Sequence, residues 1–147
     1  MEKLLKGVLL LVLSMMMMPL QAAEGKDADS SVSTFDWNPV IKAIIKVESN
    51  GNPNATSGAS VGVLQITPVL VTECNNILRS RRSKKRFKLK DRFNVAKSIE
   101  MFKLIQSFHN PKNNIERAIR SWNGGMHYSV RRTQRYYEKV MRALRMG

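Results

Sequence analysis

Glu48 is the residue of this sequence whose position most clearly indicates chemistry. It follows Ile41, Ile44 and Ile45 at the spacing i, i+3, i+4 and i+7, which places the four side chains on one helical face. Either the helix ends here and Glu48 turns to solvent or pairs with an arginine, or the carboxyl is partly buried at a desolvation cost. A partly buried carboxyl near the negative end of its helix has a raised pKa, stays protonated near neutral pH and can act as a general acid.

Several short sequence motifs occur at and after Glu48. Together, in this order, they identify a protein family far more specifically than any one of them does alone. They are Glu48-Ser49, then Gly51-Asn52-Pro53 with Ala55 and Ser57, then Gly62 to Pro68, and finally Ser121 to Gly125. Together they resemble the motifs of bacterial lytic transglycosylases of the soluble lytic transglycosylase (SLT) family, which is related to goose-type lysozyme. The resemblance covers roughly residues 36 to 145. It implies a mainly α-helical fold, a single lysozyme-like helical domain, and action on the glycan strands of peptidoglycan.

The resemblance also implies roles for individual residues. Glu48 is the catalytic acid and then the base, and it protonates the glycosidic oxygen between MurNAc and GlcNAc. Ser49 helps to fix the end of the helix, and Ser57 lies across from Glu48. The remaining substrate-binding positions line the sugar cleft or form its far wall: Gln65, the backbone of Gly62, Val63 and Leu64, and Asn123. No metal or other cofactor is implied.

Trp122 is a departure from the family pattern. The usual residue at this place in the last motif is a tyrosine, whose hydroxyl can orient the glutamate, whereas an indole offers only one N–H donor. Trp122 also completes the helical stripe that begins at Ile115. Two interpretations therefore stay open: simple packing in the core, or a contact with the substrate or with Glu48.

A second carboxylate decides the type of reaction. Most glycosidases use two carboxyl groups, but no Asp or Glu occurs from Ser49 through Thr72. The other acids look like cap or surface residues, although folding could bring one of them close: Asp36, Glu73, Asp91, Glu100, Glu116 and Glu138. With one glutamate, the resemblance implies that the MurNAc 6-hydroxyl attacks and leaves a 1,6-anhydro end. The alternative is a hydrolytic muramidase.

The length and the N-terminal sequence set the domain organisation. A chain of 147 residues is enough for one domain with its own core and too short for two. Lys3 and Lys6 precede an apolar run from Gly7 to Leu20, and the small residues Ala22 and Ala23 follow at a plausible cleavage point, which predicts an export signal over residues 1–23. The alternative is a membrane anchor, but a run of 14 residues is short against the ~20 needed to cross a bilayer. Residues 24–35 are polar and small and predict a flexible linker. The catalytic domain is expected over residues 36–147, in the periplasm or elsewhere in the cell envelope.

Helical periodicity and cap residues predict the elements that position the motifs. Asn38 before Pro39 is expected to cap a first helix ending near Gly51, and Ser49 to Ser60 form a loop. Asp91 is expected to cap a helix that buries Val95, Ala96, Ile99 and Phe102 and that ends at Asn110-Pro111. The other helices begin at Thr67-Pro68, at Asn113 or Asn114, and near Ser129, the last with Tyr137, Val140, Met141 and Leu144 inward. No alternating run of strand length competes.

The basic tract Arg79–Arg92 has nine Lys or Arg among its fourteen residues. The simplest interpretation is a solvated loop between two helices; retention on an anionic wall or membrane surface comes next. Nucleic-acid binding, with Phe87 available for stacking, is the third interpretation, and the export signal argues against it.

The net charge of +14 leaves a second class of function open. The chain could be a cationic wall-binding or nucleic-acid-binding module in which Glu48 is inert. A small exported domain only mildly favours work with a secretion or conjugation apparatus. Cys74, His109 and His127 do not have metal-ligand spacing, and Cys74 is expected in the core.

Overall fold

A computed structural model describes residues 35–147, which form one compact unit. The predicted export signal lies outside these residues, as does the predicted linker except for its last residue. Within residues 35–147, no helix is both long enough and apolar enough to cross a membrane.

The described unit is mainly helical, as predicted, with one very small hairpin. Its helices are α2 (Asn38–Ser49), α3 (Pro68–Ser80), the short 3-10 helix η1 (Leu89–Phe93), α4 (Val95–His109), α5 (Ile115–Gly124) and α6 (Val130–Met146). The hairpin joins β1 (Thr56–Ser57) to β2 (Ser60–Val61) with Thr56 opposite Val61. Strands of two residues are too short to give an alternating pattern, so the sequence indicated only a loop here.

The predicted starts of three helices are confirmed. Thr67, Asn114 and Ser129 are the N-caps of α3, α5 and α6, and each side chain accepts a hydrogen bond from the N–H of the third residue of its helix. Two predicted caps are wrong. The N-cap of α2 is Trp37, and Asn38 is the first helical residue, its N–H bound by the Asp36 carboxylate at 2.9 Å.

The predicted start of α4 is also wrong, because Asn94 and not Asp91 is its N-cap. Asp91 lies in η1, where it accepts the Lys88 N–H and pairs with Lys97. The first turn of α4 lies at the surface, so Val95 is 42% exposed and Ala96 is exposed too, against expectation. Phe102 is fully buried and Ile99 partly buried, as predicted, and the buried face of α4 also includes Ser98, Met101, Ile105 and Gln106.

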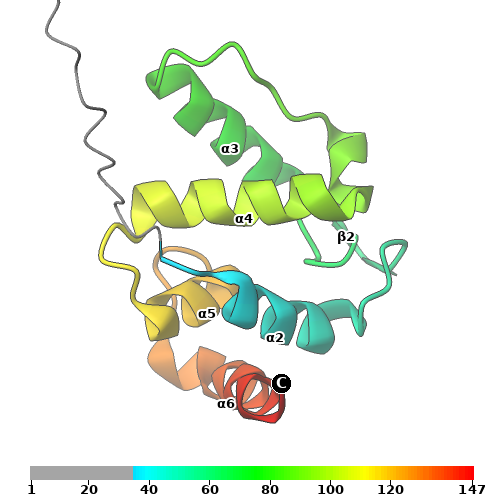
Figure 1. The fold of residues 1–147 in the computed structure, drawn as a ribbon, viewed down its shortest axis with the longest axis vertical. Helices are drawn as coiled ribbons and strands as arrows, with labels where there is room; N and C mark the ends of the chain where they lie inside the picture. Colours follow the sequence, from blue (N-terminus) through cyan, green and yellow to red (C-terminus); the bar gives the residue numbers. More distant parts are fainter. Residues whose placement is uncertain (1–34) are drawn as a thin grey trace, which may run out of the picture. The chain divides into compact units, whose positions relative to one another are not determined.

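The helices pack in two groups around a common core. Helix α4 packs against α3, while α6 packs against both α2 and α5; α4 runs between α3 and the other three helices (Figure 1). Phe102 on α4 joins the groups, with its ring 5.7 Å from that of Trp37 and 4.9 Å from that of Trp122. Cys74 is fully buried in this core, as predicted.

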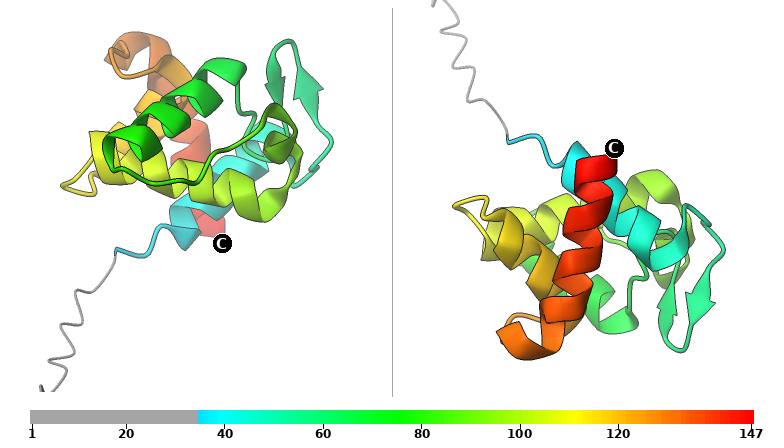
Figure 2. Two further views of the ribbon diagram at one scale, coloured as in Figure 1. Left: turned by 90° about the horizontal axis from the view of Figure 1, so that it is seen from above. Right: turned by 90° about the horizontal axis from the view of Figure 1, so that it is seen from below.

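The hairpin lies beside the C-terminal end of α2, as the two views of Figure 2 show. Val61 continues the pairing beyond the hairpin through an isolated bridge to Ile66. This pairing fixes both ends of the Gly62–Gln65 segment. The end of α2 and this segment are therefore the parts of the fold that position the predicted site.

Candidate functional site

Glu48 lies in the last turn of α2 and is half-buried. The face that it continues includes Ile41 and Ile44, which are 1% and 0% exposed. The helix stops immediately after this turn, because Asn50 takes a left-handed conformation and returns its N–H to the Lys46 carbonyl. Glu48 is thus an acid on the inward face of a helix, at the place where that face reaches the surface.

The hydroxyl of Tyr136 donates a hydrogen bond of 2.6 Å to Oε1 of Glu48. Tyr136 comes from α6, whose packing against α2 brings the two residues together. Burial raises the pKa of Tyr136, and the charge of Glu48 raises it further, so the phenol remains a proton donor at all ordinary pH values.

Tyr136 is the residue that the sequence analysis missed. It follows Thr133 by three residues and precedes Val140 by four, and both of these are buried. This spacing places Tyr136 on the inward side of α6, but the adjacent Tyr137 fits the same helical pattern, so spacing alone does not distinguish the two. Tyr137 packs its ring against the Arg120 guanidinium instead, 4.2 Å from its carbon.

Two opposing effects set the acidity of Glu48. Burial raises its pKa above the ordinary value of 4.5, and the hydrogen bond from Tyr136 lowers it. Burial is the larger effect. Because Tyr136 makes Oε1 an acceptor, the proton of the neutral acid belongs on Oε2, which has no hydrogen-bond partner within residues 35–147. The side chain can therefore offer a proton from one defined oxygen.

Among residues 35–147, no second carboxylate contributes to the acidity of Glu48. Neither effect on its pKa comes from a charged neighbour. Each of the other acids of the described unit accepts a hydrogen bond or an ion pair elsewhere: Asp36 from Asn38, Glu73 from His109, Asp91 from Lys97, Glu100 from Lys85, Glu116 from Arg120 and Glu138 from Gln134. Residues 35–147 also contain no group of three His, Cys, Asp or Glu side chains that could hold a metal ion.

Ser49 ties the end of α2 to the Gly62–Gln65 segment. Its hydroxyl donates to the Val63 carbonyl at 2.8 Å and accepts the Gly51 N–H at 3.2 Å. From the other side, the indole N–H of Trp122 donates to the Leu64 carbonyl at 3.0 Å. Trp122 therefore packs in the core against Phe102 and also holds this segment, and the structure gives it no hydrogen bond to Glu48.

The Gly62–Gln65 segment is held by its own atoms as well. The Gln65 amide donates to the Gly62 carbonyl at 2.9 Å and to the Ala55 carbonyl at 3.2 Å. The side chains of Val63 and Leu64 are buried, at 3% and 0% exposure, so only their backbone could face a ligand. Gln65 stays half-buried at the surface of the segment.

The back of this segment rests on η1. A Cβ atom at Gly62 would lie 2.0 Å from the Arg92 carbonyl oxygen, and the φ of Gly62 is +79°. The guanidinium of Arg92 donates to the carbonyls of Ala59 and Ile66 at 3.0 and 3.1 Å. Arg92 is thus a buried structural residue, although it is the last residue of a basic tract that was expected to be solvated.

Phe87 is a second correction to the interpretation of the basic tract. Its side chain is 6% exposed, and Asn75 binds both its N–H and its carbonyl, at 2.8 and 2.9 Å. It is therefore not available to stack on a base. The exposed cations of the tract include Arg81, Arg82, Lys84, Lys88 and Lys90.

Ser57 and Asn123 stand apart from the other predicted site residues. Ser57 is exposed in the hairpin, and Asn123 is exposed near the end of α5. Neither side chain has a hydrogen-bond partner within residues 35–147, so both are free to meet a ligand. Around Glu48 the structure thus joins Ser49, the Gly62–Gln65 segment and Trp122 by hydrogen bonds and leaves these two at the surface.

A protein-family model described as "Transglycosylase SLT domain" matches residues 31–144. Comparisons with curated proteins and with solved structures give no match. The matched range includes Glu48, Tyr136 and all the residues that surround them.

Proposed function

The chain belongs to the transglycosylase SLT domain family, and on that basis we propose that it is a peptidoglycan lytic transglycosylase with Glu48 as its single acid and base. The family acts on peptidoglycan, and the described unit has its lysozyme-like helical fold. The observation that carries the finer proposal is the Tyr136–Glu48 hydrogen bond to a half-buried carboxyl without a partner acid.

The proposed reaction begins with proton transfer from Oε2 of Glu48 to the glycosidic oxygen. The bond between C1 of MurNAc and that oxygen breaks, and GlcNAc leaves with its 4-hydroxyl restored. Glu48 is then a carboxylate, which the Tyr136 hydroxyl stabilises. Burial favours the acid form before this step and the tyrosine favours the base form after it, so one side chain can serve both steps.

The second step uses the substrate as its own nucleophile. The 6-hydroxyl of MurNAc attacks C1 of the same sugar, its proton passes to Glu48, and a 1,6-anhydro ring forms. This returns Glu48 to its starting state and consumes no water. The absence of a partner carboxylate supports this step, because a hydrolytic enzyme ordinarily uses a second one as nucleophile or to activate water.

We also propose that the protein works in the cell envelope, after removal of the predicted export signal over residues 1–23. The exposed cations of the basic tract would hold it near an anionic wall or membrane surface. The burial of Phe87 weighs against nucleic acid as the partner. A secretion or conjugation apparatus stays a proposed setting.

Mass spectrometry of purified peptidoglycan after digestion tests the proposal. We expect muropeptides that end in 1,6-anhydro-MurNAc, one water molecule lighter than the products of hydrolysis. Reducing MurNAc ends alone would contradict the proposal and support a hydrolytic muramidase. Binding to the wall without release of any fragment would support the non-catalytic module instead.

A further inference from the structure

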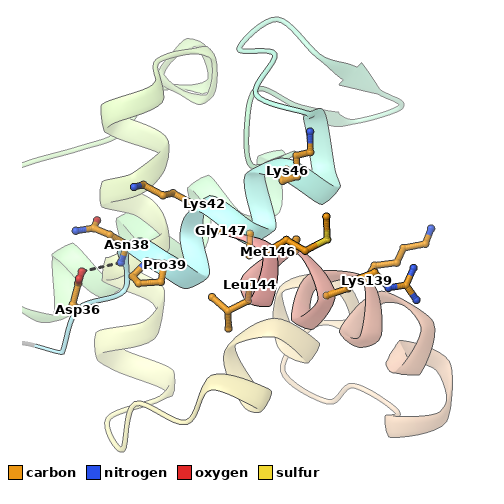
Figure 3. A pocket seen from close by; sticks show the side chains of 12 residues that line it. Asp36, Asn38, Pro39, Lys42, Lys46, Lys139, Leu144, Met146 and Gly147 are labelled. Carbon is orange, nitrogen blue, oxygen red and sulfur yellow. Dashed lines mark hydrogen bonds between the residues drawn. The ribbon is translucent and has the colours of Figure 1, made fainter.

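A groove of about 700 Å³ lies between α2 and α6, away from Glu48 (Figure 3). Residues of both helices line it: Asn38, Pro39, Lys42, Ala43 and Lys46 from α2, and Lys139, Arg142, Ala143, Leu144 and Met146 from α6, with Asp36 and Gly147 beyond the helix ends. At 100° per residue, Pro39 and Lys46 lie about 140–180° around α2 from Ile44 and Glu48, and the buried Ala43 lies between these two directions. The groove and the candidate active site are therefore on different faces of α2.

The floor of the groove is apolar. Its least exposed lining residues are Ala43 on α2 and Ala143 and Leu144 on α6, and the exposed Pro39 adds further apolar surface. Met146 stands at one end with 81% of its surface exposed. A ligand with apolar side chains would remove this surface from water.

The rim of the groove is cationic on both sides. Lys42 and Lys46 extend from α2 and Lys139 from α6 (Figure 3), and Arg142 of α6 also lines the groove. Lys46 donates only to the Asn50 amide oxygen, and the other three have no ion-pair or hydrogen-bond partner within residues 35–147. The one acidic side chain of the lining, Asp36, already accepts the Asn38 N–H. The rim thus presents four cations to an incoming ligand.

We propose that this groove binds an acidic amphipathic segment of a partner protein. An apolar floor between two cationic rims is complementary to a helix with an apolar stripe and carboxylates along both edges. Lys42 and Lys46 are one helical turn apart, which matches acidic side chains spaced i, i+4 on such a helix. Charge would guide the segment to the groove, and burial of its apolar side chains would hold it there.

The shape of the groove favours a polypeptide over a membrane. Ala43, Ala143 and Leu144 are less exposed than the four cations, so a flat lipid surface would meet the cations before it reached these apolar side chains. A protruding helical segment reaches the floor. Neither Glu48 nor Tyr136 lines the groove, so the inference does not depend on the proposed reaction.

Fluorescence anisotropy with a labelled model peptide tests the inference on the full chain. The probe is a 14-residue helix of Leu, Glu and Ala, with Leu at i, i+3, i+4 and i+7 and Glu on both edges. The control probe has the same composition in shuffled order. We expect the amphipathic probe to bind at least about tenfold more tightly than the shuffled one. Equal binding of the two probes would show attraction by net charge alone and would overturn the inference.

Two charge-reversed variants locate the binding. Lys139 and Arg142 are exposed, so the double variant Lys139→Glu, Arg142→Glu should fold normally. We expect its affinity for the amphipathic probe to be at least about tenfold lower than that of wild type. Lys84→Glu with Lys88→Glu changes the net charge equally in the basic tract, and we expect an effect below about twofold. Equal losses in both variants would contradict the inference.

Two further measurements separate other occupants from a partner segment. If the wild-type protein sediments with phosphatidylglycerol vesicles and only the Lys139→Glu, Arg142→Glu variant (the groove variant) does not, the groove binds lipid and the inference is overturned. Concentration-dependent dimers of the wild type that disappear only in the groove variant would assign it to a second copy of the chain, which would also overturn it. We expect neither result.

Discussion

The α2–α6 helix pair carries two different sites, the half-buried Glu48–Tyr136 pair and an exposed cationic groove. On the inward face, Glu48 and Tyr136 meet in partial burial, and no other charge contributes to the acidity of Glu48. On the outward face, Lys42, Lys46, Lys139 and Arg142 stand around an apolar groove. The inward face acts through the altered proton affinity of one group, whereas the outward face acts through the sum of several exposed charges. Substitutions on the two faces should therefore differ in kind as well as in size.

The largest expected effect is that of Glu48→Gln. Glutamine keeps the shape of the side chain but has no acidic proton, and general acid–base catalysis contributes about 10²–10⁴-fold to rate. We expect the release of muropeptides to fall by about that factor. Digestion of purified peptidoglycan, followed by quantification of the soluble fragments, measures it.

Glu138→Gln is the matched control on the exposed side of α6, where Glu138 accepts a hydrogen bond from Gln134. It makes the same chemical change, and we expect wild-type activity. Full activity of the Glu48→Gln variant would show that Glu48 is not the catalytic acid and base, and would leave a cationic binding module as the interpretation of the chain.

The next effect is that of Tyr136→Phe, which removes the hydrogen bond to Glu48 and keeps the ring. A hydrogen bond to a charged group is worth about 1.5–3 kcal/mol, so we expect kcat to fall about tenfold or more. The bond lowers the pKa of Glu48, and its loss should raise that pKa. The falling limb of the pH–rate profile, where the acid loses its proton, should therefore move to higher pH.

Tyr137→Phe is the control for this change, since the Tyr137 hydroxyl has no hydrogen-bond partner within residues 35–147. We expect it to keep both the rate and the pH profile. A Tyr136→Phe enzyme that is slower but has an unmoved pH profile would show that Tyr136 supports the fold without setting the acidity of Glu48.

A smaller effect is expected on stability. The folded state holds the proton of Glu48 more tightly than the unfolded chain, whose glutamate titrates near 4.5. Wild type should therefore lose stability as pH rises from that value through the raised pKa of the folded state, and stay level above it. Glu48→Gln has no such loss, so the free energy of unfolding of the variant relative to that of wild type should increase as pH rises over this interval. Urea unfolding of both proteins across the interval measures the difference, and an advantage that shrinks with rising pH would contradict the raised pKa.

The smallest effect is expected on the outward face. Exposed substitutions usually change the free energy of unfolding by less than about 0.5 kcal/mol each. Replacing Lys139 and Arg142 by Glu also reduces the net charge of +14, which eases self-repulsion. We expect the variant to be as stable as wild type or slightly more so in thermal unfolding at low salt. A clear loss of stability would show that these cations are part of the packing between α2 and α6.

Local signals in the sequence predicted most of the helices and the position of Glu48. Thr67, Asn114 and Ser129 cap as expected, because a cap depends on residues within one turn. The burial of Ile41 and Ile44 follows from spacing in the same way. These features need no knowledge of distant parts of the chain.

The features that sequence missed depend on distant contacts. Tyr136 and Tyr137 both fit the inward pattern of α6, and only the packing of α6 on α2 selects Tyr136. Arg92 looks like one more cation of a basic run until the carbonyls of Ala59 and Ile66 are placed around it. A charge run does not show which of its members fold inward.

The contact of Gly62 with the Arg92 carbonyl also limits how this domain can diversify. Gly51 has a similar left-handed conformation but open space around it, so a side chain there meets only backbone strain. Any side chain at position 62 would meet both backbone strain from the positive φ and a clash with the Arg92 carbonyl oxygen. In laboratory evolution toward altered glycans, we therefore expect tolerated substitutions at exposed positions such as Ser57 and Asn123, whereas position 62 should remain glycine.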